Sequence, residues 1–279
     1  MQKVISFFRL SIGLAYMAIV GGAFFAVCVV LLPSRRLRIA ATNVFGHWAG
    51  RFCLWITDTT VKGNVRGEMA KTRPAIYVSN HTSITDIWIA IMGSPMFTCG
   101  MAKKEIVYYP FFGQLYWISG HLRVDRDNRA QAVRSLRETA AVAKEHGLSL
   151  FIWAEGTRSR DGKLLPFKKG FGHLAMATRL PIVPVVVKGA HKGWTKNEML
   201  FRHSEVEVEV LPAIPTDDWT SANLDQKLAA VHATFNAALP EDQRGPAMTY
   251  VPRKRRTVGL ESTPPAEQVA EIVPAIATA

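Results

Sequence analysis

The chain has 279 residues, 48% of them hydrophobic and 20% charged, and it carries a net charge of +12. A chain of this length can bury one large core or two small ones, and its composition is that of a globular protein with additional apolar content. Three cysteines, Cys28, Cys53 and Cys99, match no zinc or redox spacing, and their odd number excludes a fully paired disulfide framework. The positive charge suits an anionic lipid surface or simple solubility, and no nucleic-acid-binding motif accompanies it.

The N-terminal region contains 24 consecutive uncharged residues, Leu10 to Pro33. As a helix, this run is long enough to cross the hydrocarbon core of a bilayer, which is roughly 30 Å thick. A cleaved signal peptide is the alternative, but the run exceeds the usual apolar region of about 7–15 residues, and no Ala-x-Ala-like site follows it. We favour a retained membrane segment. Because Gly13, Gly21 and Gly22 lie inside it, a single span and a hairpin within one leaflet are both open.

Basic residues follow this apolar run at Arg35, Arg36 and Arg38. The positive-inside rule then favours the cytoplasm for this end of the run and for the domain that follows, although Lys3 and Arg9 at the other end oppose that orientation. We expect a membrane protein, in a bacterial-type inner membrane, with its main domain on the cytoplasmic side.

Residues 37–60 predict a second helix, rich in aromatic residues that favour a membrane interface. A packed helix of a soluble domain explains the same pattern equally well. We assign residues 1–60 to a membrane anchor and interfacial helix.

Strands and helices alternate from residue 74 onward. The pattern predicts strands over 75–78, 122–124, 148–153, 182–187 and 205–210, and helices over 84–92, 129–146, 170–178 and 224–238. Such alternation predicts an α/β domain over residues 61–243, with a mixed or largely parallel sheet flanked by helices. Residues 244–279 are rich in proline and basic residues and predict a disordered tail.

A histidine follows the first predicted strand of this domain. His81 lies between that strand and the next predicted helix, and Asp86 falls near the start of the helix. Helix capping explains Asn80, Thr82 or Ser83, but it explains His81 poorly. Ligands of open α/β sheets bind outside the carboxyl ends of the strands. A bend before the helix would bring the imidazole to the carboxylate, which would fix the ring tautomer and leave the other nitrogen as a base.

A second polar segment follows the strand predicted over 148–153. Gly156 permits a sharp turn, Thr157 offers a hydroxyl, and Arg158 offers a planar fork suited to phosphate. An ordinary strand–turn–helix junction with surface charges is the simpler interpretation.

Basic residues also surround the short strand predicted over 122–124, including Arg123 and Arg126, and local salt bridges with Asp125 are the simpler explanation there. The chain lacks the Gly-x-Ser-x-Gly elbow, the phosphate-binding Gly-x-x-x-x-Gly-Lys loop, the dinucleotide fingerprint and the His-Glu-x-x-His zinc motif. We therefore expect no metal and no bound cofactor.

These motifs, taken in order, resemble the four blocks of the glycerolipid acyltransferase family, and among them the lysophosphatidic acid acyltransferases. The resemblance covers roughly residues 60–215. Its blocks are Asn80-His81 with Asp86, then Gly120 to Arg126, then Glu155-Gly156-Thr157-Arg158, then Ile182 to Val185, with a further similarity at Ala102 to Glu105 and Pro110 to Gly113.

The resemblance implies an α/β domain behind a membrane-embedded helical region, and it implies a role for each block. His81 would be the catalytic base and Asp86 its orienting partner. Arg126 and Arg158 would hold the phosphate of the acceptor. Glu155, Gly156 and Thr157 would shape the same site, and Lys103 is a further candidate for substrate binding.

The implied reaction moves an acyl group from acyl-CoA or acyl-carrier protein to the free hydroxyl of 1-acyl-glycerol 3-phosphate (lysophosphatidic acid), giving phosphatidic acid. This sequence has Trp153-Ala154 where most members have Phe-Pro, and His121 where a bulky aliphatic residue is usual. Another lysolipid acceptor, such as lyso-ornithine lipid or a larger lysophospholipid, is therefore an alternative. A non-catalytic module that binds anionic lipid is the alternative from a different class.

Overall fold

The computed structural model describes residues 2–109, 112–124, 129–194 and 201–248. Residues Met1–Thr249 form one compact unit, and the second unit, Tyr250–Ala279, lies outside the described residues. Most of the predicted disordered tail therefore lies outside them too, and the three-part division of the chain stays a prediction.

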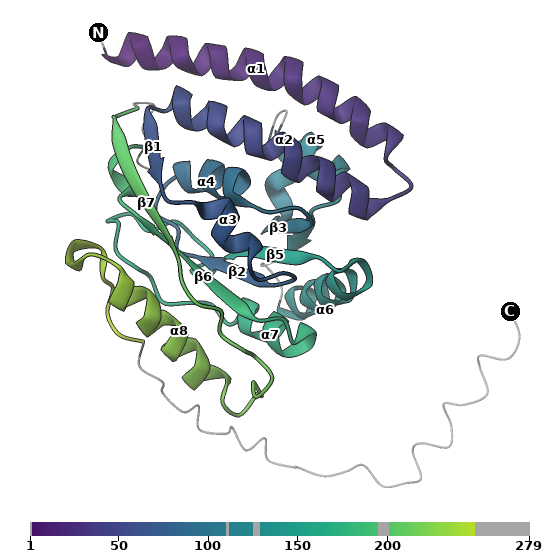
Figure 1. Ribbon diagram of the computed structural model, residues 1–279, viewed down its shortest axis with the longest axis vertical. Helices are drawn as coiled ribbons and strands as arrows, with labels where there is room; N and C mark the ends of the chain where they lie inside the picture. Colours follow the sequence, from purple (N-terminus) through teal and green to yellow (C-terminus); the bar gives the residue numbers. More distant parts are fainter. Residues whose placement is uncertain (1, 110–111, 125–128, 195–200, 249–279) are drawn as a thin grey trace, which may run out of the picture. The chain divides into compact units, whose positions relative to one another are not determined.

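The helices and strands follow one another in a largely alternating order (Figure 1). The α-helices are α1 (Gln2–Val30), α2 (Arg35–Ile56), α3 (Val65–Ala70), α4 (Thr85–Gly93), α5 (Phe112–Ile118), α6 (Arg129–His146), α7 (Gly170–Thr178) and α8 (Leu224–Ala238). The strands are β1 (Thr59–Lys62), β2 (Ile76–Ser79), β3 (Thr98–Lys103), β4 (Leu122–Val124), β5 (Ser149–Trp153), β6 (Ile182–Lys188) and β7 (Ser204–Val210). Short 3₁₀ helices are η1 (Lys104–Tyr108), η2 (Ala190–Lys192) and η3 (Glu241–Gln243).

The described strands form one sheet in the order β1-β7-β6-β2-β5-β3-β4. Neighbouring strands are parallel except for β6 and β7, which are antiparallel. The prediction of a mixed, largely parallel sheet flanked by helices is confirmed. Strands β1 and β3 and helices α3 and α5 were not predicted, because none of them shows a clear hydrophobic period.

The central strand β2 is buried on both faces, and its side chains alternate between two cores. Ile76 and Val78 pack with residues of α6, α7 and α8, whereas Tyr77 packs with residues of α2, α3 and α4. This alternation follows from the two-residue period of a strand. The sheet therefore lies between two layers of helices, and the carboxyl ends of its parallel strands meet at one edge.

The helix α2 packs closely on α4. A Cβ atom on Gly46 would lie 2.5 Å from Cγ2 of Ile91, and one on Gly50 would lie 2.7 Å from the carbonyl oxygen of Trp88. These two glycines therefore permit the close approach of the helices. The opposite side of α2 leaves Trp48 and Trp55 exposed, so the helix combines a packed face with exposed aromatic residues.

The apolar helix α1 lies beside α2 (Figure 1). Tyr16 stacks on Phe52 with ring centroids 3.9 Å apart, and Phe24 stacks on Phe45 at 4.5 Å. By length and composition, Val4–Val30 is able to cross a membrane, and most of its most apolar stretch is not buried in the protein. A helix this apolar and this exposed favours association with a lipid phase.

Candidate active site

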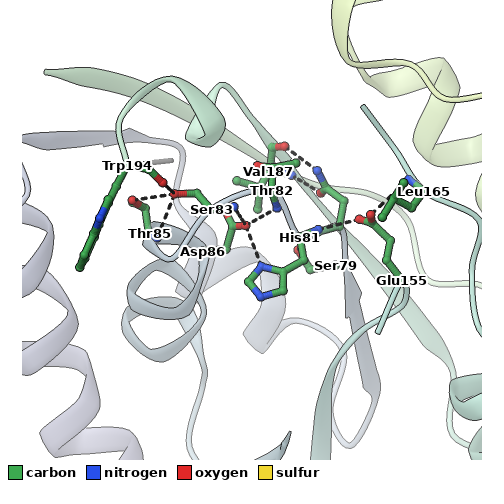
Figure 2. A network of polar contacts seen from close by, with 11 residues as sticks. Ser79, His81, Thr82, Ser83, Thr85, Asp86, Glu155, Leu165, Val187 and Trp194 are labelled. Atoms are coloured by element: carbon green, nitrogen blue, oxygen red, sulfur yellow. Dashed lines mark hydrogen bonds and ion pairs between the residues drawn. The ribbon is translucent and has the colours of Figure 1, made fainter. Parts of the chain in front are cut away.

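The carboxyl ends of β2, β5 and β6 lie side by side, because β2 pairs in parallel with both neighbours. His81 lies two residues after the end of β2, Glu155 lies two residues after the end of β5, and η2 follows β6. Residues far apart in the sequence therefore gather around the segment that joins β2 to α4 (Figure 2).

His81 and Asp86 are in contact. Nδ1 of His81 lies 2.9 Å from Oδ2 of Asp86, and the two side chains are 12% and 1% exposed. Because a carboxylate only accepts hydrogen bonds, it fixes the imidazole proton on Nδ1. Nε2 is then the unprotonated nitrogen, on the far side of the ring from Asp86 (Figure 2). This arrangement presents a base whose orientation is held by a buried carboxylate.

The same carboxylate also fixes the backbone around the histidine. Oδ2 of Asp86 accepts hydrogen bonds from the backbone N–H groups of Thr82, at 2.6 Å, and Ser83, at 2.8 Å. These amides precede α4, and Asp86 lies in its first turn, where a negative charge is also favoured by the helix dipole. Asp86 therefore shapes the bend that brings His81 to it.

Asn80 attaches this bend to the neighbouring strand. Its amide nitrogen donates to the carbonyl of Val187, and its amide oxygen accepts from the N–H of Val187, both at 2.8 Å. Asn80 is buried. Such a two-way bond orders the backbone next to the base, and helix capping, the simpler interpretation, does not describe it.

Glu155 supports His81 from the opposite side. Its Oε1 accepts from the backbone N–H of His81 at 2.7 Å, and its Oε2 accepts from that of Leu165 at 3.1 Å. The side chain is almost fully buried. Burial raises the pKa of Glu155 to about 8, against the opposing effect of the two backbone hydrogen bonds. Glu155 thus shapes the site through the backbone, with both oxygens already engaged.

The residues after Glu155 turn sharply outward. Gly156 has a φ of 70°, a left-handed conformation that glycine adopts at little cost. Thr157 is exposed, whereas Arg158 is half-buried. Nη1 of Arg158 is buried and makes no hydrogen bond to any described residue. A buried guanidinium nitrogen in this state is suited to an anionic ligand oxygen.

Two predicted site residues, Lys103 and Arg126, remain. Lys103 ends β3, which is separated from β2 by β5, and its Nζ lies 3.5 Å from Oε1 of Glu105. Arg126 lies outside the described residues. Among the described residues, no group of three or more His, Cys, Asp and Glu side chains is arranged to hold a metal ion.

An apolar cavity of about 150 Å³ lies next to this site. Its walls come from α1, α2, α4, β3, α5 and β5, and they include Phe24, Trp88, Tyr116 and Trp153. Trp153 also stacks on the imidazole of His81, with ring centroids 4.7 Å apart and an interplanar angle of 20°. Trp153 therefore lies between the wall of this cavity and the imidazole of His81. Sequence reasoning noted Trp153 only as a departure from a family pattern and missed this contact.

The similarity of this chain to known proteins identifies its family. Residues 62–188 match the family model described as "Acyltransferase". The chain is 40% identical to the 1-acyl-sn-glycerol-3-phosphate acyltransferase of Limnanthes douglasii, over 86% of this chain and 85% of that one. It is 35% identical to the enzyme of the same name from Escherichia coli, over 76% of this chain and 84% of that one.

The chain belongs to the 1-acyl-sn-glycerol-3-phosphate acyltransferase family. The recognition made from the ordered motifs is thus confirmed. A crystal structure of the 1-acyl-sn-glycerophosphate acyltransferase from Thermotoga maritima has the same fold, with a TM-score of 0.67 over 82% of this chain and 92% of that one, at 23% identity. Membership of this family and the apolar α1 together indicate an enzyme that associates with membranes.

Proposed function

We propose that this acyltransferase moves a fatty acyl group from a thioester to the sn-2 hydroxyl of 1-acyl-glycerol 3-phosphate, giving phosphatidic acid. The observation that carries the proposal is the contact between Nδ1 of His81 and Oδ2 of Asp86, which leaves Nε2 as an oriented base beside an apolar cavity. The names of the related enzymes support the same acceptor.

In the first step, Nε2 of His81 accepts the proton of the acceptor hydroxyl while the hydroxyl oxygen bonds to the thioester carbonyl carbon. The tetrahedral intermediate then breaks its carbon–sulfur bond, and the thiolate takes the proton back from His81. The imidazolium formed between the two events is stabilised by Asp86. General-base assistance of this kind contributes about 10²–10⁴ in rate. No covalent acyl-enzyme is required.

We assign the acceptor phosphate to Arg158. Its Nη1 has no hydrogen-bond partner among the described residues. Arg158 lies three residues after Glu155, which bonds the backbone of His81. A guanidinium binds phosphate through two parallel hydrogen bonds, which fixes the distance from the phosphate to the base. Arg126, which precedes α6, is the second candidate for this role, with Thr157 and Lys103 as further candidates for substrate contact.

We assign the membrane contact to α1 and to the exposed aromatic residues of α2. The acceptor and the product are both lipids, and α1 contributes Met17 and Phe24 to the wall of the cavity. We therefore propose that a lipid chain enters this cavity along α1 and lies against Trp153, which stacks on His81. We propose a bacterial-type inner membrane, with the α/β domain on the cytoplasmic side where acyl-CoA and acyl-carrier protein are found.

The test is a transfer assay with the purified protein in lipid vesicles. Radiolabelled acyl-CoA or acyl-carrier protein is supplied with lysophosphatidic acid, lyso-ornithine lipid or lysophosphatidylcholine, and the labelled lipid product is identified. We expect labelled phosphatidic acid from at least one donor. A product formed only from another acceptor would change the assigned substrate. Vesicle binding without consumption of any thioester would favour a non-catalytic lipid-binding module.

A further inference from the structure

Trp153 lies against both the base and the cavity. One face of its indole stacks on the imidazole of His81, nearly parallel at 20°. The same residue lines the apolar cavity, and the ring of Phe151 meets it at 69° with centroids 5.4 Å apart. Trp153 ends β5, so its position is set by the sheet rather than by a loop. One partner of the stack is therefore a residue of the central sheet.

A parallel indole face acts on only one of the two states of the imidazole. The face of an aromatic ring carries negative potential and attracts a cation, and tryptophan does so more strongly than phenylalanine. A neutral imidazole gains little from this attraction, whereas an imidazolium gains it fully. During acyl transfer the ring of His81 becomes an imidazolium. Trp153 covers one face of this same ring.

We propose that Trp153 is a positioning residue that stabilises the protonated His81 formed during acyl transfer, in addition to Asp86. This inference rests on the proposed role of His81 as the base. Asp86 holds one edge of the ring through Nδ1, and Trp153 covers one face, so Nε2 is left at the free edge. The contribution of Trp153 is electrostatic and greater than that of the phenylalanine usual at this position.

Other charged and titratable groups lie near His81 and Trp153, and they are present in every variant. Asp86 of α4 bonds the imidazole, and Glu155 after β5 bonds its backbone N–H. His191 of η2 interacts electrostatically with Asp86 and with Asp161, and burial lowers the pKa of His191. Since none of these four residues is altered by a change at Trp153, a difference between variants at that position reports on the stack.

Trp88 provides a matched control. Its indole lines the same cavity, and its Nε1, like that of Trp153, is buried without a hydrogen-bond partner among the described residues. Its ring meets Phe112 at 89° and has no described ring contact with His81. Trp153→Leu and Trp88→Leu therefore both remove an indole from the cavity wall, but only the first removes the stack on the base.

The experiment compares pH profiles of kcat and kcat/KM for the wild-type protein, Trp153→Leu, Trp153→Phe and Trp88→Leu in vesicles. For Trp153→Leu we expect the plateau of kcat to fall by about 3- to 30-fold, and the acid limb of kcat/KM to move about 0.5–1 pH unit lower. The limb moves down because protonating the free base becomes harder without the stack. Trp153→Phe should give an intermediate shift, and Trp88→Leu should leave the limb in place.

An acid limb that is unmoved in Trp153→Leu, or moved equally in Trp88→Leu, would overturn the proposal and leave Trp153 as a packing residue. Thermal unfolding of each variant identifies loss of folded protein. If Trp153→Leu is unfolded, Trp153→Phe is measured in its place, and an acid limb that is unmoved in that variant would equally overturn the proposal. Failure of the proposed function is distinguishable, because the wild-type protein would then transfer no acyl group at any pH.

Discussion

Two segments that follow the neighbouring strands β2 and β5 differ in how fully their polar groups are hydrogen-bonded. The segment between β2 and α4 is tied at almost every residue, because Asn80 bonds β6 and Asp86 bonds His81, Thr82 and Ser83. The segment after β5 begins with the buried Glu155 and then turns outward at Gly156 to Arg158, whose Nη1 has no partner among the described residues.

This difference separates two tasks. Under the proposed function, the first segment orders the base before any substrate arrives, which avoids reorganisation during the reaction. The second leaves a cation available, so that a ligand oxygen supplies the missing hydrogen bond. Glu155 connects the two segments, since it lies near the start of the second segment and accepts a hydrogen bond from the backbone of His81 in the first. Changes in the first segment should therefore reduce turnover, and changes in the second should reduce acceptor binding.

The largest expected effect is that of His81→Ala. We expect kcat to fall by about 10²–10⁴-fold, because the acceptor hydroxyl loses its general base, while binding to lipid vesicles is retained. The matched control is His203→Ala, since His203 also faces an aspartate, Asp58 at 3.4 Å, but is largely exposed. Equal turnover of His81→Ala and wild-type protein would show that the segment between β2 and α4 has no catalytic role.

A smaller effect of a different kind is expected from Arg158→Ala. Loss of a charged hydrogen bond to phosphate should raise the KM for lysophosphatidic acid by about 10- to 100-fold, with a smaller change in kcat. Arg160→Ala, an exposed arginine two residues further on, is the control. If the KM is unchanged for lysophosphatidic acid, the phosphate is bound elsewhere and the division of tasks fails.

The smallest effect concerns the residue that joins the two segments. A glutamate has a pKa of about 4.3 when unfolded, and burial raises the pKa of Glu155 to about 8. The stabilisation from its bound proton is therefore complete below about pH 4.3 and is lost as the pH rises through about 8.

Glu155→Gln cannot ionise, so its Tm should fall less than that of the wild-type protein between pH 5 and pH 8.5. We expect a difference on the order of 5 °C by thermal unfolding in detergent. Glu145→Gln, at a largely exposed glutamate, is the control and should follow the wild-type curve. Parallel curves for Glu155→Gln and wild-type protein would show that Glu155 is ionised throughout this range.

Much of the fold was predictable because its signals are local. The predicted limits of the helices α6, α7 and α8 agree with the structure, since each has a clear period and a clear end, as at Gly147 after α6. Strand β1 was missed because Thr59–Lys62 is short, and its neighbour β7 lies far away in the sequence. Its place in the sheet depends on a partner that local pattern does not reveal.

The candidate site was predictable only in part. His81 and Asp86 are five positions apart, and the polar residues between them indicated the bend that joins them. Glu155 was expected to shape the substrate site, but its bond to the backbone of His81 depends on the pairing of β2 with β5. The same pairing creates the stack between Trp153 and His81, which no spacing in the sequence encodes.

A double-mutant cycle on His81 and Asp86 tests the central claim most directly. Rates of acyl transfer to lysophosphatidic acid are measured for His81→Ala, Asp86→Asn and the double variant, at one pH and with folded protein verified. If Asp86 acts through the imidazole, the double variant should be within about threefold of His81→Ala alone. Losses that multiply in the double variant would contradict the account, because the carboxylate would then act on the reaction independently of the histidine.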